Sequence, residues 1–152
     1  MKHYRSELLL SAPASTVFQA LTTPKGLKGW WTTTCEIGTA VGEQSTFRIG
    51  QTYKVMQIER LEPNSEVRWQ CVGAHIHMPG ILTKTQEWVG TTIVFHLIPK
   101  SESSTLLQFD HVGLTPEIEC FTICTAGWNQ FLASLKSYVE SGAGTPYAEP
   151  AV

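Results

Sequence analysis

The sequence has little charge and no marked excess of either sign. Charged residues make up 16% of its 152 residues, and the formal net charge is −2. The basic residues are scattered, whereas a nucleic-acid-binding surface needs them gathered on one face or along one stripe. We therefore expect no nucleic-acid partner.

Long hydrophobic runs are also missing. No apolar run approaches the roughly 18 residues that a membrane-spanning helix needs. Near the N-terminus only Leu8, Leu9 and Leu10 are consecutive, which is too short for the apolar segment of a secretory signal. We expect a protein without a membrane span, located in the cytoplasm.

The sequence lacks the usual motifs of metal, phosphate and nucleophile sites. The four cysteines form no C-x-x-C pair, no Gly-Lys-Ser/Thr loop occurs, and no serine lies in a nucleophile-elbow motif. Cys120 and Cys124 share a face of a predicted helix, so a metal or redox pair there is the alternative to two buried free thiols. His75 and His77 could supply two metal ligands, but no third ligand is near them in sequence. We expect no metal and no cofactor.

What the sequence does contain is the pattern of one α+β domain over residues 1–142, followed by a C-terminal tail over residues 143–152. The length suits a single domain. Short strands follow one another with turns too short for crossover helices, which favours antiparallel pairing. Two short helices are expected over residues 14–22 and from Thr23-Pro24 to Trp31, and strands over residues 3–10, 33–37, 44–49, 52–61, 66–73, 85–98 and 104–112.

The clearest predicted element is a long helix near the C-terminus. Thr115 is a suitable N-cap, Pro116 suits the first helical position, and Gly142 suits a left-handed end. Apolar residues recur between these ends at the helical spacing of three and four. About 25 residues at 1.5 Å each would give a helix of about 37 Å, long enough to cross a small domain.

A helix of this kind against a curved sheet predicts a cavity. A twisted sheet cannot follow a straight cylinder along its whole length, so space remains between the two. Five Trp, six Phe and four Tyr are available to line or fill that space. Alternation along the strands places one set of side chains on the inner face: Phe47, Ile49, Val67, Trp69, Cys71, Ile93, Phe95, Leu97, Leu107, Phe109 and His111.

Several short motifs, in this order, resemble the START-like superfamily, also called SRPBCC. They are Gly29-Trp30-Trp31, Glu87-Trp88-Val89-Gly90-Thr91-Thr92, His111-Val112-Gly113-Leu114, Gly127-Trp128, Phe131-Leu132 and Ser134-Leu135-Lys136. Within it the chain is most similar to the heat-shock protein 90 ATPase activator homologues of the C-terminal-domain type. The resemblance implies the helix-grip fold of the START-like and pollen-allergen-like proteins, with six to seven strands around the long helix and two short helices. It also implies a deep pocket for lipids, polyketides or other small apolar molecules, and it does not imply catalysis.

The first functional hypothesis is therefore the binding of a small hydrophobic or amphipathic molecule in the cavity, without catalysis. Trp30 and Trp31 are adjacent large aromatics after a glycine, so one of them could gate the pocket. The residues expected to contact the ligand are Trp30, Trp31, Phe47, Trp69, Glu87, Phe95, Phe109, His111, Phe121, Cys124, Trp128 and Phe131.

Two other hypotheses remain open. In the first, the protein is an enzyme of the polyketide cyclase or hydrolase kind, in which Glu87 and His111 exchange protons with a substrate in an apolar cleft. The same two residues could instead hydrogen-bond each other or orient a polar group of the ligand. In the second, the protein is a co-chaperone-like interaction module with a chaperone partner. A homodimer is compatible with each of these hypotheses.

Overall fold

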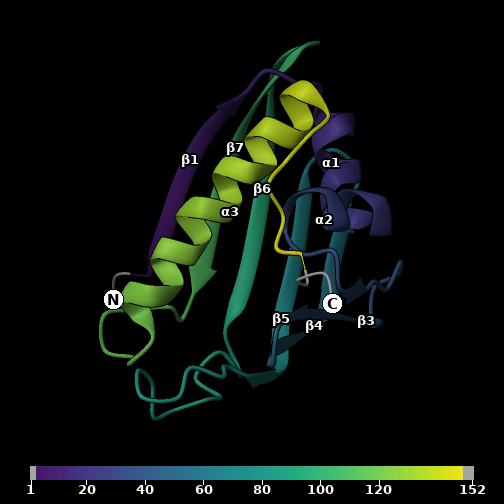
Figure 1. The fold of residues 1–152 in the computed structure, drawn as a ribbon. Coiled ribbons are helices and arrows are strands. Elements are labelled where there is room, and N and C mark those ends of the chain that lie inside the picture. Colours follow the sequence, from purple (N-terminus) through teal and green to yellow (C-terminus); the bar gives the residue numbers. More distant parts are fainter. Residues whose placement is uncertain (1–2, 149–152) are drawn as a thin grey trace.

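The fold is a seven-stranded antiparallel sheet with one long helix lying across its inner face (Figure 1). The computed structural model describes residues 3–148. The strands lie in the order β1-β7-β6-β5-β4-β3-β2. This is the helix-grip fold that the sequence predicts. The elements are β1 (Tyr4–Leu10), α1 (Ala14–Thr22), α2 (Pro24–Trp30), β2 (Cys35–Glu36), β3 (Gln44–Ile49), β4 (Thr52–Glu62), β5 (Glu66–His75), β6 (Thr92–Ser101), β7 (Ser104–Val112) and α3 (Phe121–Ser141).

The long helix α3 begins at Phe121, so the predicted start with Thr115 as N-cap and Pro116 as first residue is wrong. Residues 115–120 form tight turns instead, in which the backbone N–H of Ile118 bonds to the Thr115 carbonyl. The helix therefore has 21 residues and a length of about 32 Å. Its predicted end is confirmed: Gly142 has a φ of 86° and donates its N–H to the Tyr138 carbonyl.

The strand predicted over residues 85–98 is shorter at its start, because β6 begins at Thr92. Gly90 adopts a φ of +91°, a left-handed conformation that ends any extended segment. The preceding Trp88 accepts the Thr91 N–H in a turn. Trp88 consequently lies on the loop between β5 and β6, which runs below the start of α3 in Figure 1.

The inner face of the sheet carries the predicted core. All the residues expected to face inward are buried except Ile49, which is half-buried. The aromatic rings of this face form one continuous cluster with three tryptophans from α2, the residue after it and α3. Its members are Trp30, Trp31, Phe47, Trp69, Phe95, Phe109 and Trp128. The ring centroids of neighbouring members lie 4.1–6.0 Å apart, the range of favourable aromatic pairs.

Helices α1 and α2 pack against each other and cover one end of the sheet. Gly26 allows this close contact, because a Cβ there would lie 2.6 Å from the Cα of Ala20. Trp30 is buried between the helices and donates its indole N–H to the Ala20 carbonyl at 2.8 Å. Both adjacent tryptophans are buried, and the rings of Trp30 and Trp31 are stacked with their centroids 5.7 Å apart.

The described part of the C-terminal tail returns across the molecule rather than leaving it. The Thr145 N–H bonds to the Ser134 hydroxyl at 2.7 Å. Tyr147 forms a parallel bridge with Thr32, donating its N–H to the Trp31 carbonyl at 2.8 Å. Figure 1 shows this segment passing beside α2 toward β4 and β5. The tail thereby brings the side chain of Tyr147 to the inner face of the sheet.

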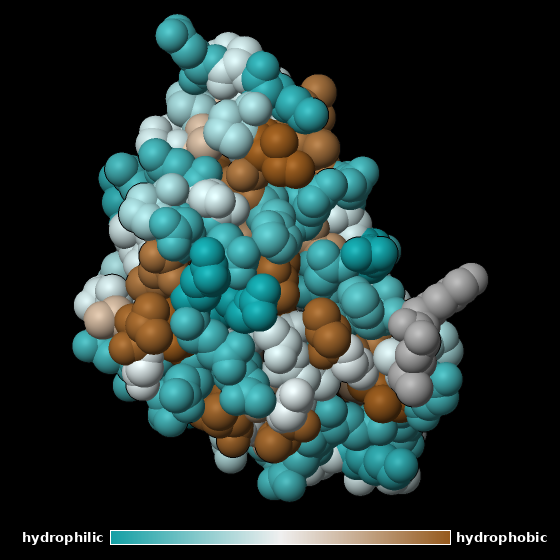
Figure 2. All heavy atoms as spheres, turned by 180° about the vertical axis from the view of Figure 1, so that it is seen from behind, coloured by the Kyte–Doolittle hydropathy of each residue, from teal (hydrophilic) through white to brown (hydrophobic). Residues whose placement is uncertain are grey.

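The outer face of the molecule is mostly hydrophilic. Figure 2 shows small apolar patches separated by polar side chains. Val72 on β5 and Val112 on β7 are among the exposed apolar residues. No helix within residues 3–148 is long and apolar enough to cross a membrane.

Candidate ligand-binding site

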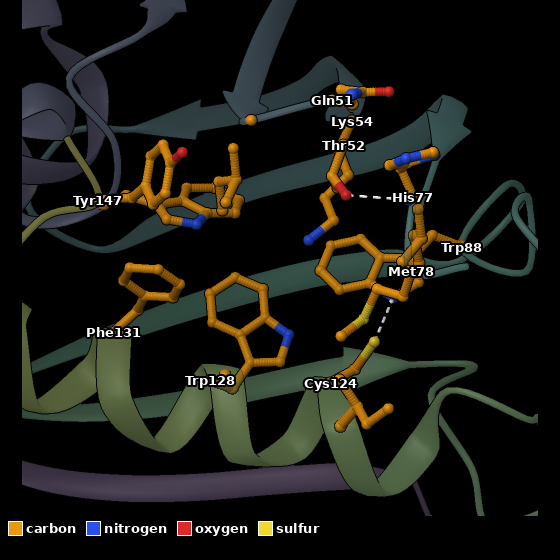
Figure 3. Close-up of a pocket in the computed structure, with 16 residues that line it drawn as sticks. Gln51, Thr52, Lys54, His77, Met78, Trp88, Cys124, Trp128, Phe131 and Tyr147 are labelled. Atoms are coloured by element: carbon orange, nitrogen blue, oxygen red, sulfur yellow. Dashed lines mark hydrogen bonds between the residues drawn. The ribbon is translucent and has the colours of Figure 1, made fainter. Parts of the chain in front are cut away.

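A pocket of about 520 Å³ lies between the first half of α3 and the β3–β4 hairpin (Figure 3), and it is partly open to solvent. The helix and the sheet diverge here, as a straight helix on a curved sheet requires. The pocket is lined by Trp31, Ile49, Gly50, Gln51, Thr52, Lys54, Ile76, His77, Met78, Trp88, Ile123, Cys124, Gly127, Trp128, Phe131 and Tyr147.

One face of α3 forms the apolar wall. Cys124, Gly127, Trp128 and Phe131 follow the spacing of three and four that places side chains on one side of a helix. Figure 3 shows Trp128 and Phe131 directed from α3 into the pocket. Trp31 continues the wall, with its ring centroid 5.2 Å from that of Trp128.

Lys54 brings a cation into this apolar site. It lies on β4 in phase with the buried Met56 and Ile58, so the pleat of the strand turns its side chain to the inner face. Its Nζ lies 3.9 Å from the centroid of the Trp88 ring. Within residues 3–148 this ammonium has no hydrogen bond and no carboxylate within 4 Å. Burial lowers the pKa of Lys54 below its ordinary value, and the nearby cysteines oppose this effect only in part.

The thiol of Cys124 lies beside Lys54. It accepts a hydrogen bond from the Trp88 indole N–H at 3.2 Å, drawn as a dashed line in Figure 3. A hydrogen bond from Cys120, the Lys54 charge and this indole lower the pKa of Cys124, although burial acts in the opposite direction. Cys71, by contrast, has its pKa raised to about 11 by burial. Cys124 is therefore the thiol best suited to react from the pocket.

Two carboxylates fix the loop that carries Trp88. Glu87 accepts the backbone N–H groups of Glu119 and Cys120 at 2.9 and 3.1 Å, immediately before α3. Glu119 in turn accepts the N–H groups of Thr83 and Lys84, each at 2.8 Å. Glu87 therefore holds the turn that precedes α3, beside the positive end of the helix dipole. The N-cap residue of α3 is Cys120, whose side chain makes no capping hydrogen bond.

The buried His111 on β7 forms hydrogen bonds to α3 and to the loop that precedes β6. Its Nδ1 accepts the Trp128 indole N–H at 2.9 Å, so Nε2 carries the proton and donates it to the Thr91 hydroxyl at 2.9 Å. The Thr91 hydroxyl in turn donates a hydrogen bond to the Trp88 carbonyl at 2.6 Å. Burial, with a smaller effect of Lys54, lowers the pKa of His111 to about 3. The imidazole is thus neutral and fully hydrogen-bonded.

The structure divides the predicted ligand-contacting residues into two groups. Four of them, Trp31, Cys124, Trp128 and Phe131, line the pocket. The others do not reach its surface: Trp30, Phe47, Trp69, Phe95, Phe109 and His111 are packed in the core, and Glu87 and Phe121 lie half-buried near the start of α3. Contact of the first group with a ligand stays a prediction.

Twelve residues that line the pocket were not predicted as ligand contacts, and Lys54, Gly127 and Tyr147 are three of them. Lys54 could have been found by alternation, because it is in phase with Met56 and Ile58 on one strand. Gly127 could have been found on the apolar face of α3, between Cys124 and Trp128. No sequence signal indicates Tyr147, which reaches the site through the return of the tail.

The histidines of the H-x-H pair lie at the edge of the site. The rings of His75 and His77 are stacked with centroids 5.8 Å apart, and His77 lines the pocket. The part of the chain that the structure describes contains no group of three or more metal-ligating side chains.

Known structures share this architecture along nearly the whole chain. The solution structure of the Aha1 dimer from Colwellia psychrerythraea is 32% identical, with a TM-score of 0.78, and the match covers 95% of this chain and 100% of that one. Protein MLL2253 from Mesorhizobium loti is 18% identical with a TM-score of 0.72, over 90% of this chain and 95% of that one. DynU16, a putative protein in the dynemicin biosynthetic locus, is 21% identical with a TM-score of 0.69, over 92% of this chain and 48% of that one.

A comparison with curated proteins found no match. The family described as Activator of Hsp90 ATPase homolog 1-like protein, however, matches residues 11–140. Together with the Colwellia relative, this match covers the sheet, the pocket and most of α3. The chain therefore belongs to the family of Activator of Hsp90 ATPase homolog 1-like proteins.

Proposed function

We propose that the protein binds a small amphipathic molecule in the pocket under α3. The observation that carries the proposal is a pocket of about 520 Å³ with mostly apolar walls and a lysine, Lys54, that meets no carboxylate among residues 3–148. Small-molecule sites in proteins have volumes of roughly 300–1,000 Å³, apolar linings and a few placed polar groups. The pocket agrees with each of these features.

Gly127 supports the proposal from the side of the helix. A glycine inside a helix costs about 1 kcal/mol relative to alanine. Such a residue is often explained by a close neighbour, yet a Cβ at Gly127 would meet nothing within 4 Å. The space beside this turn of α3 therefore remains open to a ligand instead of being filled by the protein.

The alternative of acid–base catalysis by His111 and Glu87 receives less support. Both ring nitrogens of His111 are already hydrogen-bonded, and with a pKa of about 3 the neutral imidazole does not take up a proton near neutrality. Both carboxylate oxygens of Glu87 hold backbone N–H groups before α3. These arrangements favour structural roles and leave binding as the better-supported function.

Fluorescence of the neutral probe N-phenyl-1-naphthylamine tests the proposal. We expect the probe to bind the wild-type protein, and Gly127→Phe to weaken binding at least tenfold by filling the pocket. Gly127→Ala is the matched control and should bind as the wild type does. Thermal unfolding of each variant shows that the fold is kept. Absence of probe binding to the wild type, or equal binding by Gly127→Phe, would contradict the proposal.

A second candidate function is interaction with a chaperone, which the name of the family favours. The Colwellia relative is described as a dimer, so a homodimer is proposed as well. If the chain acts as a surface module, it should change the ATPase rate of an Hsp90-type chaperone, and Gly127→Phe should change it equally. An unchanged ATPase rate with no co-purification would exclude this function, and sedimentation analysis would test the dimer.

A further inference from the structure

We infer that Lys54 selects the ligand by charge: the molecule bound in the pocket is an amphipathic carboxylate whose anionic group pairs with the Lys54 ammonium. This inference rests on the proposed function and names the chemical class of the ligand. The apolar body of the ligand would lie against Trp31, Trp128 and Phe131, which form the wall beside Lys54.

The first argument is the unusual isolation of this charge. The other lysines and arginines in residues 3–148 either meet a carboxylate, as Lys136 meets Glu140 and Arg5 meets Asp110, or are exposed to solvent, as Lys25, Lys28, Lys84 and Lys100 are. Lys54 instead has the apolar Phe47 and Ala74 as its register partners on the neighbouring strands. The Lys54 side chain is half-buried, and withdrawing a charge from water is costly unless a counter-charge and hydrogen bonds compensate it. In this site, the carboxylate of a ligand can supply both.

The second argument concerns the Lys54 amine itself, namely its charged form and its N–H donors. The face of Trp88 lies 3.9 Å from Nζ, an arrangement that favours the charged ammonium through the ring quadrupole. The Trp88 ring has no net charge, so it does not neutralise the ammonium, and it covers only one side of the ammonium. An ammonium has three N–H donors, and none of them is used by a described residue. The donors of Lys54 therefore remain available to oxygen atoms in the pocket.

The third argument is the sign of the surrounding charge. Among the described residues that line the pocket, none is an aspartate or a glutamate, so an entering anion meets no repulsion there. A cationic ligand would be placed next to the Lys54 ammonium without compensation. Figure 3 shows Lys54 reaching from β4 toward the centre of the site, with Trp88 and Trp128 between it and α3. A carboxylate at Nζ would therefore lie inside the pocket and not at its rim.

Displacement of N-phenyl-1-naphthylamine by matched ligands tests the inference. Decanoate and decanol share an aliphatic body, whereas 1-naphthaleneacetate and 2-(1-naphthyl)ethanol share an aromatic one. Comparing the two pairs shows whether the pocket prefers an aliphatic or an aromatic acid. In the wild type each acid should bind at least about tenfold more tightly than its alcohol, the effect of one charge-assisted hydrogen bond. Decylammonium should displace the probe least.

Two variants assign the selectivity to the side chain. Lys54→Met keeps the length of the side chain and removes the charge, so it should weaken acid binding about tenfold and leave alcohol binding unchanged. Lys54→Arg keeps the charge and should keep the preference for acids. The inference would be overturned, and the proposed function kept, if alcohols bound the wild type as tightly as acids do. The same would follow if the preference for acids survived in Lys54→Met. A wild-type protein that binds neither the probe nor any ligand would overturn the proposed function as well.

Discussion

The variant His111→Gln tests whether the neutral imidazole stabilises the fold through its hydrogen bonds to Trp128 and Thr91. The glutamine amide can imitate the neutral imidazole, because its oxygen can accept the Trp128 indole N–H and its nitrogen can donate to Thr91. Unlike histidine, it cannot take up a proton. His111→Ala is the contrasting variant, since it leaves a cavity and an unpaired indole N–H. We expect His111→Ala to cost about 3–5 kcal/mol at pH 7 and His111→Gln markedly less.

The contribution of His111 to the pH dependence of stability follows from its pKa in the folded and in the unfolded chain. Folding lowers the pKa of His111 from 6.5 to about 3, so between these values the unfolded chain binds a proton that the folded protein does not. Stability that is present above pH 6.5 is therefore lost as the pH falls toward 3, at about 1.4 kcal/mol per pH unit and by at most about 5 kcal/mol. At pH 4.5 the loss from this residue alone is about 2–3 kcal/mol.

Urea unfolding at pH 7, 5.5 and 4.5 measures the effect. Groups that do not interact with His111 contribute equally in both proteins, so the difference between wild type and His111→Gln isolates the effect of His111. The free energy of unfolding of His111→Gln should fall less steeply with acidification than that of the wild type. Parallel pH profiles would refute the reasoning, as would a loss at pH 7 as large as that of His111→Ala.

Three further predictions concern the pocket and the turn before α3. Glu87→Ala should lower the free energy of unfolding by about 1 kcal/mol, because two N–H groups before α3 lose their acceptor, and an unchanged urea midpoint would count against this role of Glu87. Iodoacetamide should modify Cys124 before Cys71, and a bound ligand should slow that reaction; peptide mapping that finds Cys71 modified first would disprove it. Gly127→Ala should stabilise the protein by about 1 kcal/mol, or roughly 3 °C in Tm, and a lower Tm would show that the space there is not free.

The fold was predictable because its signals are local. Alternation placed Trp69, Phe95 and Phe109 on the inner face, and all three are buried there. Gly142 ends α3 as its position suggested, because a left-handed residue after a helical pattern needs no distant partner. These features depend on neighbours in sequence, which the chain itself displays.

The errors and omissions arise from contacts between distant residues. Thr115 has the chemistry of an N-cap, but the helix begins at Phe121, after a turn whose N–H groups are bound by Glu87 from a loop more than 30 residues away. Tyr147 reaches the pocket only because the tail pairs with Thr32. Such contacts are set by tertiary packing and leave no periodic trace in the sequence.

Lys54 is a different case, because its inward direction was readable from the alternation of β4. A lysine on a strand is ordinarily assigned to the solvent face, since burial of its charge is costly. The same cost makes the exception informative. Conversely, His111 looked like a reactive group from its inward position, but its bonds to Trp128 and Thr91 are visible only in the structure.

The most direct test of the account is heteronuclear NMR of nitrogen-labelled protein titrated with decanoate. We predict that the largest shifts will occur at the backbone amides of Gly50 and Gly127 and at the indole N–H of Trp31, all on pocket-lining residues. Val72 and Val112, on the outer face, should not respond. Shifts confined to the outer face, or none at saturating ligand, would contradict a binding site between α3 and the β3–β4 hairpin.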